Sequence, residues 1–474
     1  MKNKHLMYPL LLLFYSSFAR SQVPLVLTPE QLQTDFARFQ TALQEAHPAP
    51  YRYTPKGTFD SLMVATRARL NRPMSQQEFY QVMTPLLVAL RDGHIKWIVA
   101  GRDQHYPFHP DTLFPLKLYF LQDKAWVVGS YDTGTIPPGA EVGAINGQPM
   151  AAIIERLLAQ GTFADGKTLN GKYEDLNHFF SGYYATFVGA PATFDLTYCY
   201  ADTDTTVRIA PVTFEAIKKY EGTLRIVSQN ARLSFEDSTK TALLTIRRFW
   251  TEGDEPSYKK FLAQAFREIE TRKCTALILD LRDNEGGEEK YGIKLYRYLA
   301  QRPFRYYDRI SVRQKKALSF PAYTPKLYRM LRGLVVKKQG DGYVFTAQRG
   351  LKIRKPERHA FAGKLYVLLN GGSFSVTTEF AARVHADRRG TFIGQETSGA
   401  YEGDNSGIFA ITQLPHSKID LGVPLFGFYM ANLPADLEKG QGIRPDHPVI
   451  PSIEDVLMGR DPAMQYVRQL ISNQ

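Results

Sequence analysis

The sequence predicts an α/β protein built from several modules. Two stretches, residues 275–290 and 361–390, share one order of features: an apolar run typical of a buried strand, a glycine-containing turn, and a helical pattern. Helical periodicity before residue 100 and short β-type runs between about 110 and 215 indicate two further modules. The chain has 474 residues with 44% hydrophobic content, which is enough for large cores and two or three domains.

The N-terminus has the pattern of a secretory signal peptide. Lys2 and Lys4 precede an apolar run that ends at Phe18, and Ala19-Arg20-Ser21 suits cleavage before Gln22. We therefore predict a signal peptide over residues 1–21 and export to the periplasm or the extracellular medium. The run is too short to span a bilayer and no other segment is apolar enough, so no stable membrane span is expected. Cleavage would lower the formal net charge from +12 to +9.

Residues 22–105 predict an N-terminal helical domain. One helix begins at Thr28-Pro29-Glu30, a second covers about 59–70, and a third begins at Ser75 with Glu78 completing a capping box. The third helix stops at Arg91-Asp92-Gly93-His94, and a strand follows over Ile95–Val99. His94 is therefore expected at a tight helix-to-strand junction, where a histidine is ordinarily a turn or core residue.

The sequence predicts a β-rich module over residues 110–215 and the α/β core over residues 220–474. The module should hold strands at 114–121, 125–131 and 140–145, a turn at Asn146-Gly147 and a helix at 151–158. The core should begin with strands at 225–227 and 243–249 and a helix at 258–269.

An insert at 302–358 interrupts the core and is dense in Arg and Lys, and its sequence predicts irregular structure. Nucleic-acid binding is one interpretation of so basic a segment. In an exported chain, a solvated lid or a surface for acidic partners fits better, so we predict no nucleic-acid partner.

Cysteine and ligand patterns argue against cofactors. Cys199 and Cys274 are the only cysteines and lie in separate apolar runs, so we expect two buried thiols, no disulfide framework and no zinc site. No phosphate-binding loop is present either. We predict no metal and no cofactor, and nothing in the sequence sets an oligomeric state.

Ser373 and Ser375 lie where a strand turns into a helix. A hydroxyl at such a turn is lifted clear of the sheet, and the next backbone N–H, at the start of the helix, can face developing negative charge. This is a suitable place for a nucleophile. The alternative is that one of these serines only caps the helix, as serine commonly does.

Several motifs together resemble the tail-specific, or C-terminal-processing, serine peptidase family. The matching runs are DLRDNEGG at 280–287, SVTTEFA at 375–381, GQETSG at 394–399 and LEKGQGIRPD at 437–446. The resemblance implies a ClpP/crotonase-like catalytic core and a peptidase that forms an acyl-enzyme on Ser375, with Ser373 as the rival. It also implies an oxyanion hole from the Val376 N–H and an N–H of Gly286 or Gly287. Asp280, Arg282 and Asn284 are interpreted as structural ties of the glycine turn.

The general base departs from the lysine-dyad members of that family. Those members carry a lysine directly after the GExTxG-like turn, whereas this chain has Ala400 and no lysine before Lys418. The DGH corner resembles the tricorn-like and retinoid-binding-protein-like branch that lacks the lysine, which implies His94 as the base. Glu438 in the closing run could orient its ring. His385, on the helix that follows Ser375, is interpreted as an exposed helix residue.

Residues 136–147 resemble part of a PDZ domain, which takes peptide ends by strand addition. We therefore predict a PDZ-like module over 110–215 and a peptide or protein substrate. Two alternatives stay open: a catalytically inactive homologue, suggested by Ala400, and an apolar-ligand-binding protein on the same fold. The joint presence of Ser375, the glycine pair and His94 favours the enzyme.

Overall fold

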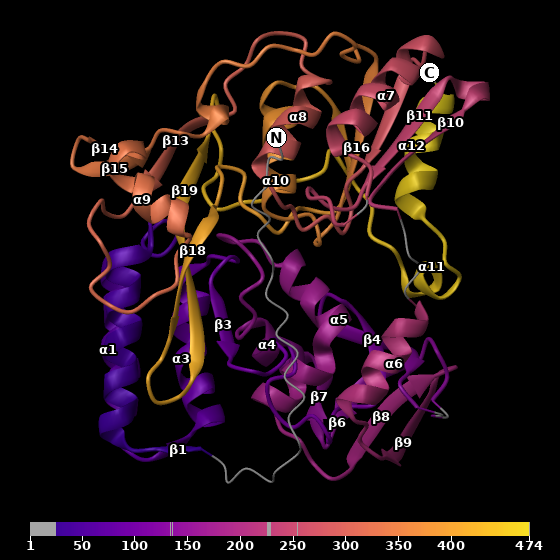
Figure 1. Ribbon diagram of the computed structural model, residues 1–474. Coiled ribbons are helices and arrows are strands. Elements are labelled where there is room, and N and C mark those ends of the chain that lie inside the picture. Colours follow the sequence, from indigo (N-terminus) through magenta and orange to yellow (C-terminus); the bar gives the residue numbers. More distant parts are fainter. Residues whose placement is uncertain (1–24, 133, 135, 225–228, 254, 474) are drawn as a thin grey trace.

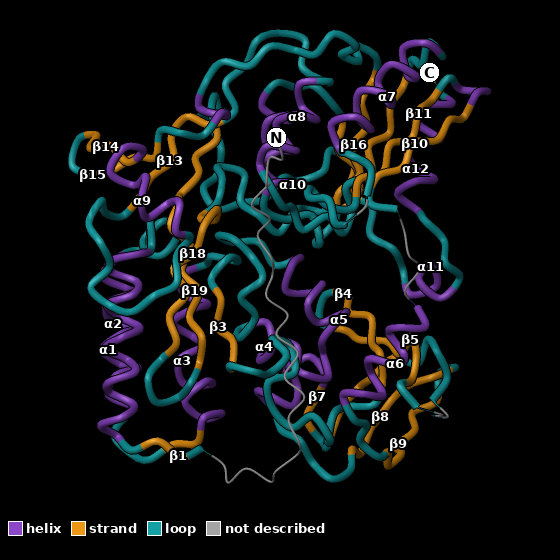
Figure 2. Tube along the Cα trace, in the orientation of Figure 1, coloured by secondary structure: helices purple, strands orange, loops and turns teal. Residues whose placement is uncertain are grey.

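A computed structural model describes residues 25–132, 134, 136–224, 229–253 and 255–473 (Figure 1). The predicted signal peptide and the predicted strand at 225–227 lie outside these residues. Figures 1 and 2 show N-terminal helices beside a long β-ribbon, a β-rich module next to them, and a sheet with flanking helices above both. In the described part of the chain, no helix is long and apolar enough to cross a membrane.

The first and third N-terminal helices begin at the residues that the sequence predicts, whereas the second begins at Lys56, three residues before its predicted start. Thr28 and Ser75 accept hydrogen bonds from the N–H groups of Gln31 and Glu78, whose side chains accept from the cap N–H groups in return. These two capping boxes satisfy helix-end donors that would otherwise have no partner. The elements are β1 (Val26–Leu27), α1 (Pro29–Ala46), α2 (Lys56–Arg69), β2 (Met74–Ser75) and α3 (Gln76–Leu90).

The β-rich module contains the strands, turn and helix predicted between residues 114 and 158. Its antiparallel sheet has the order β4-β5-β6-β8-β9, with β7 paired to β6 through a turn at Asn146-Gly147, and α5 packs on β4. The elements are β4 (Leu116–Leu121), β5 (Lys124–Ser130), β6 (Glu141–Ile145), β7 (Gln148–Pro149), α4 (Met150–Leu158), α5 (Asn170–Phe187), β8 (Phe194–Tyr200), β9 (Thr203–Ile209) and α6 (Phe214–Leu224).

The core sheet has the order β10-β11-β12-β16-β17-β20, and all its pairings are parallel except β10 with β11. Every residue of β12 is buried, as a central parallel strand requires. The strands are β10 (Ala231–Glu236), β11 (Thr241–Ile246), β12 (Ala276–Asp280), β16 (Lys364–Leu369), β17 (Thr391–Gly394) and β20 (His447–Pro448). The helices are α7 (Tyr258–Thr271), α8 (Glu289–Arg297), α10 (Val376–Ala386), α11 (Ile453–Leu457) and α12 (Pro462–Ser472). Because β12 and β16 are parallel, the turns that follow them meet at one edge of the sheet.

A second antiparallel sheet joins the core to the N-terminal helices. Its order is β14-β15-β13-β19-β18. Strand β3 pairs with the first residues of β19, whereas β13 pairs with its last residues. The elements are β3 (Lys96–Val99), β13 (Tyr307–Val312), α9 (Lys326–Val335), β14 (Val336–Gln339), β15 (Gly342–Phe345), β18 (Asn405–Gln413) and β19 (Ile419–Met430).

The prediction that the insert at 302–358 is irregular is wrong. Strand β13 adds to β19, β14 and β15 form a hairpin, and α9 precedes the hairpin. The many Arg and Lys residues, which lie on exposed faces of these elements, made the helix and strand periodicity of the insert hard to recognise in the sequence. Cys199 and Cys274 are both free, and each is half-buried rather than fully buried.

Candidate active site

Ser375 lies at the turn between β16 and α10. Its backbone has a conformation that residues with a side chain rarely adopt. Its φ is 54° and its ψ is −125°, a combination that is strained for any residue except glycine. Ser375 occupies the cap position of α10, but its side chain makes no capping hydrogen bond. The hydroxyl is directed instead to His94, whose Nε2 lies 3.0 Å from Ser375 Oγ.

Ser373 has a structural role. Its side chain is fully buried and donates a hydrogen bond to the carbonyl of Leu281 at 2.9 Å. Its oxygen also accepts from the N–H of Asn370 at 3.2 Å. The first bond holds the turn after β16 against the turn after β12, and the second lies within the turn after β16, so this hydroxyl has no free direction toward a substrate.

His94 lies at the corner between α3 and β3, as the sequence predicts. Its ring stacks on Phe374, with ring centroids 4.5 Å apart and planes 27° apart. Gly93 permits this approach, because a Cβ at that position would lie 2.7 Å from Phe374 Cζ and 3.1 Å from the backbone nitrogen of Ala164. The ring is therefore held by an aromatic neighbour that immediately precedes Ser375.

Two buried aspartates lie beside the imidazole. Asp92 Oδ1 accepts a hydrogen bond from the His94 backbone N–H at 2.9 Å and is 3.9 Å from His94 Nδ1. The other Asp92 oxygen is 2.9 Å from His47 Nε2. Asp165 accepts from the N–H of Gly93 at 2.8 Å. Within the described residues, the buried atoms His94 Nδ1 and Asp165 Oδ2 have no hydrogen-bond partner.

The environment assigns different charges to these groups. Burial lowers the pKa of His94, although the charges of Asp404 and Asp92 oppose that effect, so the ring is neutral near pH 7. Burial alone would raise the pKa of Asp92, but the hydrogen bond and charge of His47 outweigh it and lower this pKa. Burial and then the charge of Asp92 raise the pKa of Asp165 well above its usual range. These shifts favour the charged form of Asp92 and the protonated form of Asp165.

Backbone N–H groups from two turns meet beside the Ser375 hydroxyl. A Cβ at Gly286 would lie 2.8 Å from Ser375 Cβ and 2.8 Å from the nitrogen of Val376, so the glycine turn runs directly against the start of α10. The N–H of Gly286 is occupied, because it donates to Asn284 Oδ1 at 2.9 Å. Among the described residues, the N–H groups of Gly287 and Val376 have no acceptor. The free pair of donors is thus Gly287 and Val376.

The polar residues of the 280–287 run hold the glycine turn in place, in agreement with their predicted structural role. Asn284 is fully buried, and its Nδ2 donates to the carbonyl of Ile246 at 3.0 Å. Arg282 bonds to Asp280 at 2.9 Å and to Asp461 at 2.8 Å. These bonds link the end of β12 to β11 and to the start of α12.

The structure does not bring Glu438 to His94. Glu438 is more than half exposed, pairs with Lys167 at 2.6 Å and accepts a hydrogen bond from Gln441. His385 does not reach Ser375 either, because its Nδ1 lies 2.7 Å from the hydroxyl of Tyr401. Ala400, at the position of the lysine in the lysine-dyad pattern, is buried.

Asp92, His94 and Asp165 also form the one group in the described part of the chain whose ligand atoms lie close enough for a shared metal ion, within 4.8 Å of one another. Metal ligands must be deprotonated. Burial raises the pKa of Asp165, and the Asp92 carboxylate already lies against His47 Nε2 and accepts a hydrogen bond from a backbone N–H. The contact of His94 with Ser375 fits acid–base chemistry at this group.

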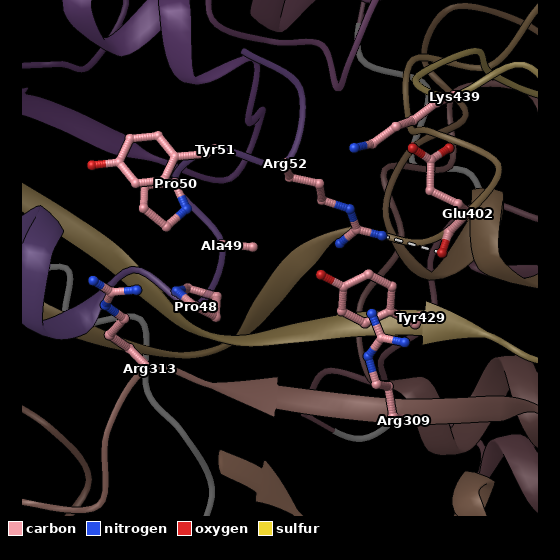
Figure 3. A pocket seen from close by; sticks show the side chains of 10 residues that line it. All are labelled: Pro48, Ala49, Pro50, Tyr51, Arg52, Arg309, Arg313, Glu402, Tyr429 and Lys439. Atoms are coloured by element: carbon pink, nitrogen blue, oxygen red, sulfur yellow. Dashed lines mark hydrogen bonds between the residues drawn. The ribbon is translucent and has the colours of Figure 1, made fainter. Parts of the chain in front are cut away.

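A basic pocket lies beside the segment that follows Ala400 (Figure 3). Its volume is ≈ 380 Å³. Arg52 is buried there and donates to the carbonyls of Asp404 and Phe428, at 2.8 and 3.0 Å, and to that of Glu402 at 3.1 Å. Its guanidinium lies 4.3 Å from the centroid of the Tyr429 ring, on which Arg309 also stacks, at 3.9 Å. Arg52 thereby fixes the segment whose Asp404 charge acts on His94. The lining residues are Pro48, Ala49, Pro50, Tyr51, Arg52, Arg309, Arg313, Glu402, Tyr429 and Lys439.

The sequence analysis missed the acids that contact the histidine corner. Asp92 could have been predicted from the sequence, because an acid two residues before a histidine in a tight turn can accept a hydrogen bond from the backbone N–H of that histidine. Asp165 could not, since it lies in a loop of the β-rich module and meets Gly93 only after the modules pack together. His47, which directly follows α1, is the partner of Asp92.

Comparisons with known proteins identify relatives of this arrangement. Residues 240–449 match the family described as Peptidase family S41. Two solved structures share the fold: mature CPAF, with a TM-score of 0.60 and 14% identity, covering 94% of this chain and 98% of its own; and a CPAF point mutant, with a TM-score of 0.66 and 13% identity, covering 94% and 98%. At these identities the likeness establishes the fold. A search of curated proteins found no match.

Gly93→Ala tests the packing of the histidine corner. The added methyl would lie 2.7 Å from the Phe374 ring, so we expect the apparent free energy of unfolding to fall by about 1–3 kcal/mol, as for an overpacked core. Urea unfolding followed by fluorescence measures this. Gly57→Ala is the control, because no atom lies within 4 Å of a Cβ there. Equal stability of the two variants would contradict the described contact.

Proposed function

We propose that the protein is an exported serine peptidase that cleaves peptide bonds through an acyl-enzyme, because residues 240–449 match peptidase family S41, a family of serine-type peptidases. The observation that carries this proposal is the 3.0 Å contact between Ser375 Oγ and His94 Nε2. Nucleophile and base at hydrogen-bond distance are the minimum that hydroxyl activation requires.

The reaction follows from that contact. The Ser375 oxygen attacks the carbonyl carbon of the substrate while His94 Nε2 accepts the hydroxyl proton, and the carbonyl electron pair moves to its oxygen. The protonated His94 then donates to the amide nitrogen, the C–N bond breaks, and the amine leaves. Water next attacks the ester carbonyl with the same histidine as base, which releases the second product and restores the hydroxyl.

The developing oxyanion is assigned to the N–H groups of Val376 and Gly287. Both donors are unoccupied within the described residues, whereas Gly286 has already used its N–H on Asn284. Gly286 contributes by having no side chain, since any Cβ would lie against Ser375. Removing one such donor typically lowers the rate about 100- to 1,000-fold.

Asp92 takes the role that the sequence suggested for Glu438. When His94 gains the serine proton, its positive charge faces the Asp92 carboxylate, 3.9 Å from Nδ1. His47 and the His94 backbone N–H hold that carboxylate in place. Asp165 carries a proton and fixes the corner through Gly93. Asp92 thus supplies the charge and Asp165 supplies the position.

The match to a peptidase family supports a peptide or protein substrate. The N-terminal pattern of residues 1–21 supports export, and the β-rich module between 110 and 215, interpreted as PDZ-like, is a reasonable place to hold an extended peptide end. The two alternatives, an inactive homologue and a carrier of apolar ligands, are disfavoured. Neither requires a strained serine, a neutral buried histidine and two free amides to converge.

Ser375→Ala is expected to abolish peptide hydrolysis and labelling by a fluorophosphonate probe, because the nucleophile is lost. Labelling is read on a gel and hydrolysis with a quenched fluorescent casein. Ser373→Ala is the matched control and should still be labelled, although with reduced stability, because it loses a buried hydrogen bond. Undiminished labelling of the Ser375 variant would move the nucleophile elsewhere.

The pH profile should show an acidic limb below pH 6.5. The base must be neutral to accept a proton, and burial lowers the pKa of His94 from its ordinary value. Activity should therefore persist below pH 6.5 and fall only as the ring becomes protonated. Measurement of kcat/KM between pH 4 and 8 checks this, with the range set around the ordinary histidine value of about 6.5. An acidic limb centred above that value would contradict a buried neutral base.

Replacing each of three acids by its amide distinguishes the roles of Asp92, Asp165 and Glu438. Asp92→Asn should lower kcat by about 100-fold or more with little change in KM, and should move the acidic limb to lower pH, because a charge that favours the imidazolium is lost. Asp165→Asn should have less than about a tenfold effect, since the amide resembles the protonated carboxyl. Glu438→Gln should change little. A large loss in Glu438→Gln with normal activity in Asp92→Asn would restore the role first predicted for Glu438.

A further inference from the structure

Helix α9 in the basic insert presents an apolar stripe to solvent. Leu327, Met330, Leu331 and Leu334 follow the spacing that normally faces a protein core, yet they are 59%, 77%, 38% and 68% exposed. No residue of α9 is buried. The helix lies with β14 and β15 at one side of the molecule, away from α12 (orange, left in Figure 1).

The opposite side of this element is firmly attached. Tyr328 packs edge-on against Phe426 of β19, with ring centroids 5.5 Å apart, and Phe345 of β15 stacks on the same ring at 4.5 Å. Val336, directly after α9, is fully buried. The exposed stripe is therefore a fixed feature of a packed helix.

Positive charge flanks the stripe along the sequence. Residues 313–338 contain eight cations and no Asp or Glu: Arg313, Lys315, Lys316, Lys326, Arg329, Arg332, Lys337 and Lys338. None of them forms an ion pair with a carboxylate in the described part of the chain. Apolar residues on one face of a helix with Lys and Arg beside them are the composition of helices that lie in a membrane interface.

We propose that α9 and its flanking cations dock the protein on an anionic lipid surface. Leu327, Met330 and Leu334 would enter the boundary between headgroups and acyl chains, and the cations would contact lipid phosphates. The apolar stripe and the unpaired cations require an occupant that is both apolar and anionic, which a bilayer with acidic headgroups supplies over one continuous plane.

Other occupants fit the surface less well. A second copy of the chain would bring the same eight cations face to face across a two-fold interface, which like-charge repulsion opposes. Protein interfaces draw most of their affinity from Trp, Tyr and Arg in pockets and little from Leu. The stripe holds leucines and a methionine on a projecting helix, and no pocket borders it among those described.

Docking through α9 would also orient the candidate active site. Strand β13 of the insert pairs with β19, and β19 pairs with β3, which begins two residues after His94. Through this continuous sheet the membrane contact and the histidine corner keep a fixed relation. Protein substrates held at the same surface would then meet the site by diffusion in two dimensions.

Vesicle co-sedimentation of the full chain tests the proposal. We expect binding to vesicles of equal parts phosphatidylglycerol and phosphatidylcholine, no binding to pure phosphatidylcholine, and weaker binding in high salt. Joint Leu327→Gln, Met330→Gln and Leu334→Gln should lower the partition coefficient by on the order of 100-fold. Lys326→Gln with Arg329→Gln should lower it about fivefold per charge.

Matched controls come from exposed residues elsewhere on the chain. The apolar control is the joint variant Ile450→Gln, Leu457→Gln and Met458→Gln, whose side chains are also exposed. The charge control is Lys259→Gln with Lys260→Gln on α7. Neither control should change binding, and all variants should keep hydrolysis of a soluble peptide, because none of the replaced residues lies in the candidate site.

Three results would overturn the proposal. One is the absence of binding to the phosphatidylglycerol vesicles, and another is equal binding by the stripe variant and its control. The third is a dimer in sedimentation velocity that the stripe substitutions convert to a monomer, which would assign the stripe to a second copy. Each result leaves the peptidase proposal intact, since that depends on Ser375 and His94.

Discussion

The pairing of β3 with β19 is the contact on which the candidate site depends. Ser375 and His94 lie 281 residues apart in the sequence, and β3 follows the histidine corner immediately. Gly422 of β19 lets the strands approach, because a Cβ there would lie 2.9 Å from Lys96 Cβ. Since β19 also pairs with β13 and β18, one long strand fixes the histidine corner relative to the C-terminal half of the core.

Backbone strain at the edge of the core sheet is held by this framework. Ser375 has a φ of 54°, and Gly286 and Gly287 have φ values of 98° and 140°. A residue other than glycine in such a conformation, as Ser375 is, costs of order 1–3 kcal/mol. It persists only where the surrounding structure holds the backbone in place. Here the N–H of Phe374 donates to the carbonyl of Asn284 at 3.1 Å, and Ser373 bonds across to Leu281. The two turns therefore hold each other in the conformation that exposes the Ser375 hydroxyl.

The sequence was most informative where local rules determine structure. It predicts β16, the caps of α1 and α3, and the DGH corner, because strand patterns and capping boxes are short-range signals. It predicts the insert wrongly, since its strands exist only through pairing with β19. It does not find Asp165, whose contact with Gly93 depends on how two modules meet. Nor could it choose between Gly286 and Gly287, because that choice rests on which N–H Asn284 already binds.

The charges around His94 suit a ring that is neutral at rest and positive during reaction. If Asp92 and Asp165 were both ionised, their repulsion in a buried site would be costly, and the proton on Asp165 removes it. The remaining charges of Asp92 and Asp404 favour the imidazolium. Arg52 binds the carbonyl of Asp404 and leaves its carboxylate to Ser406, so the segment is fixed while its charge stays available. Such a field acts on the transition state more than on the resting enzyme, and this difference is what accelerates a reaction.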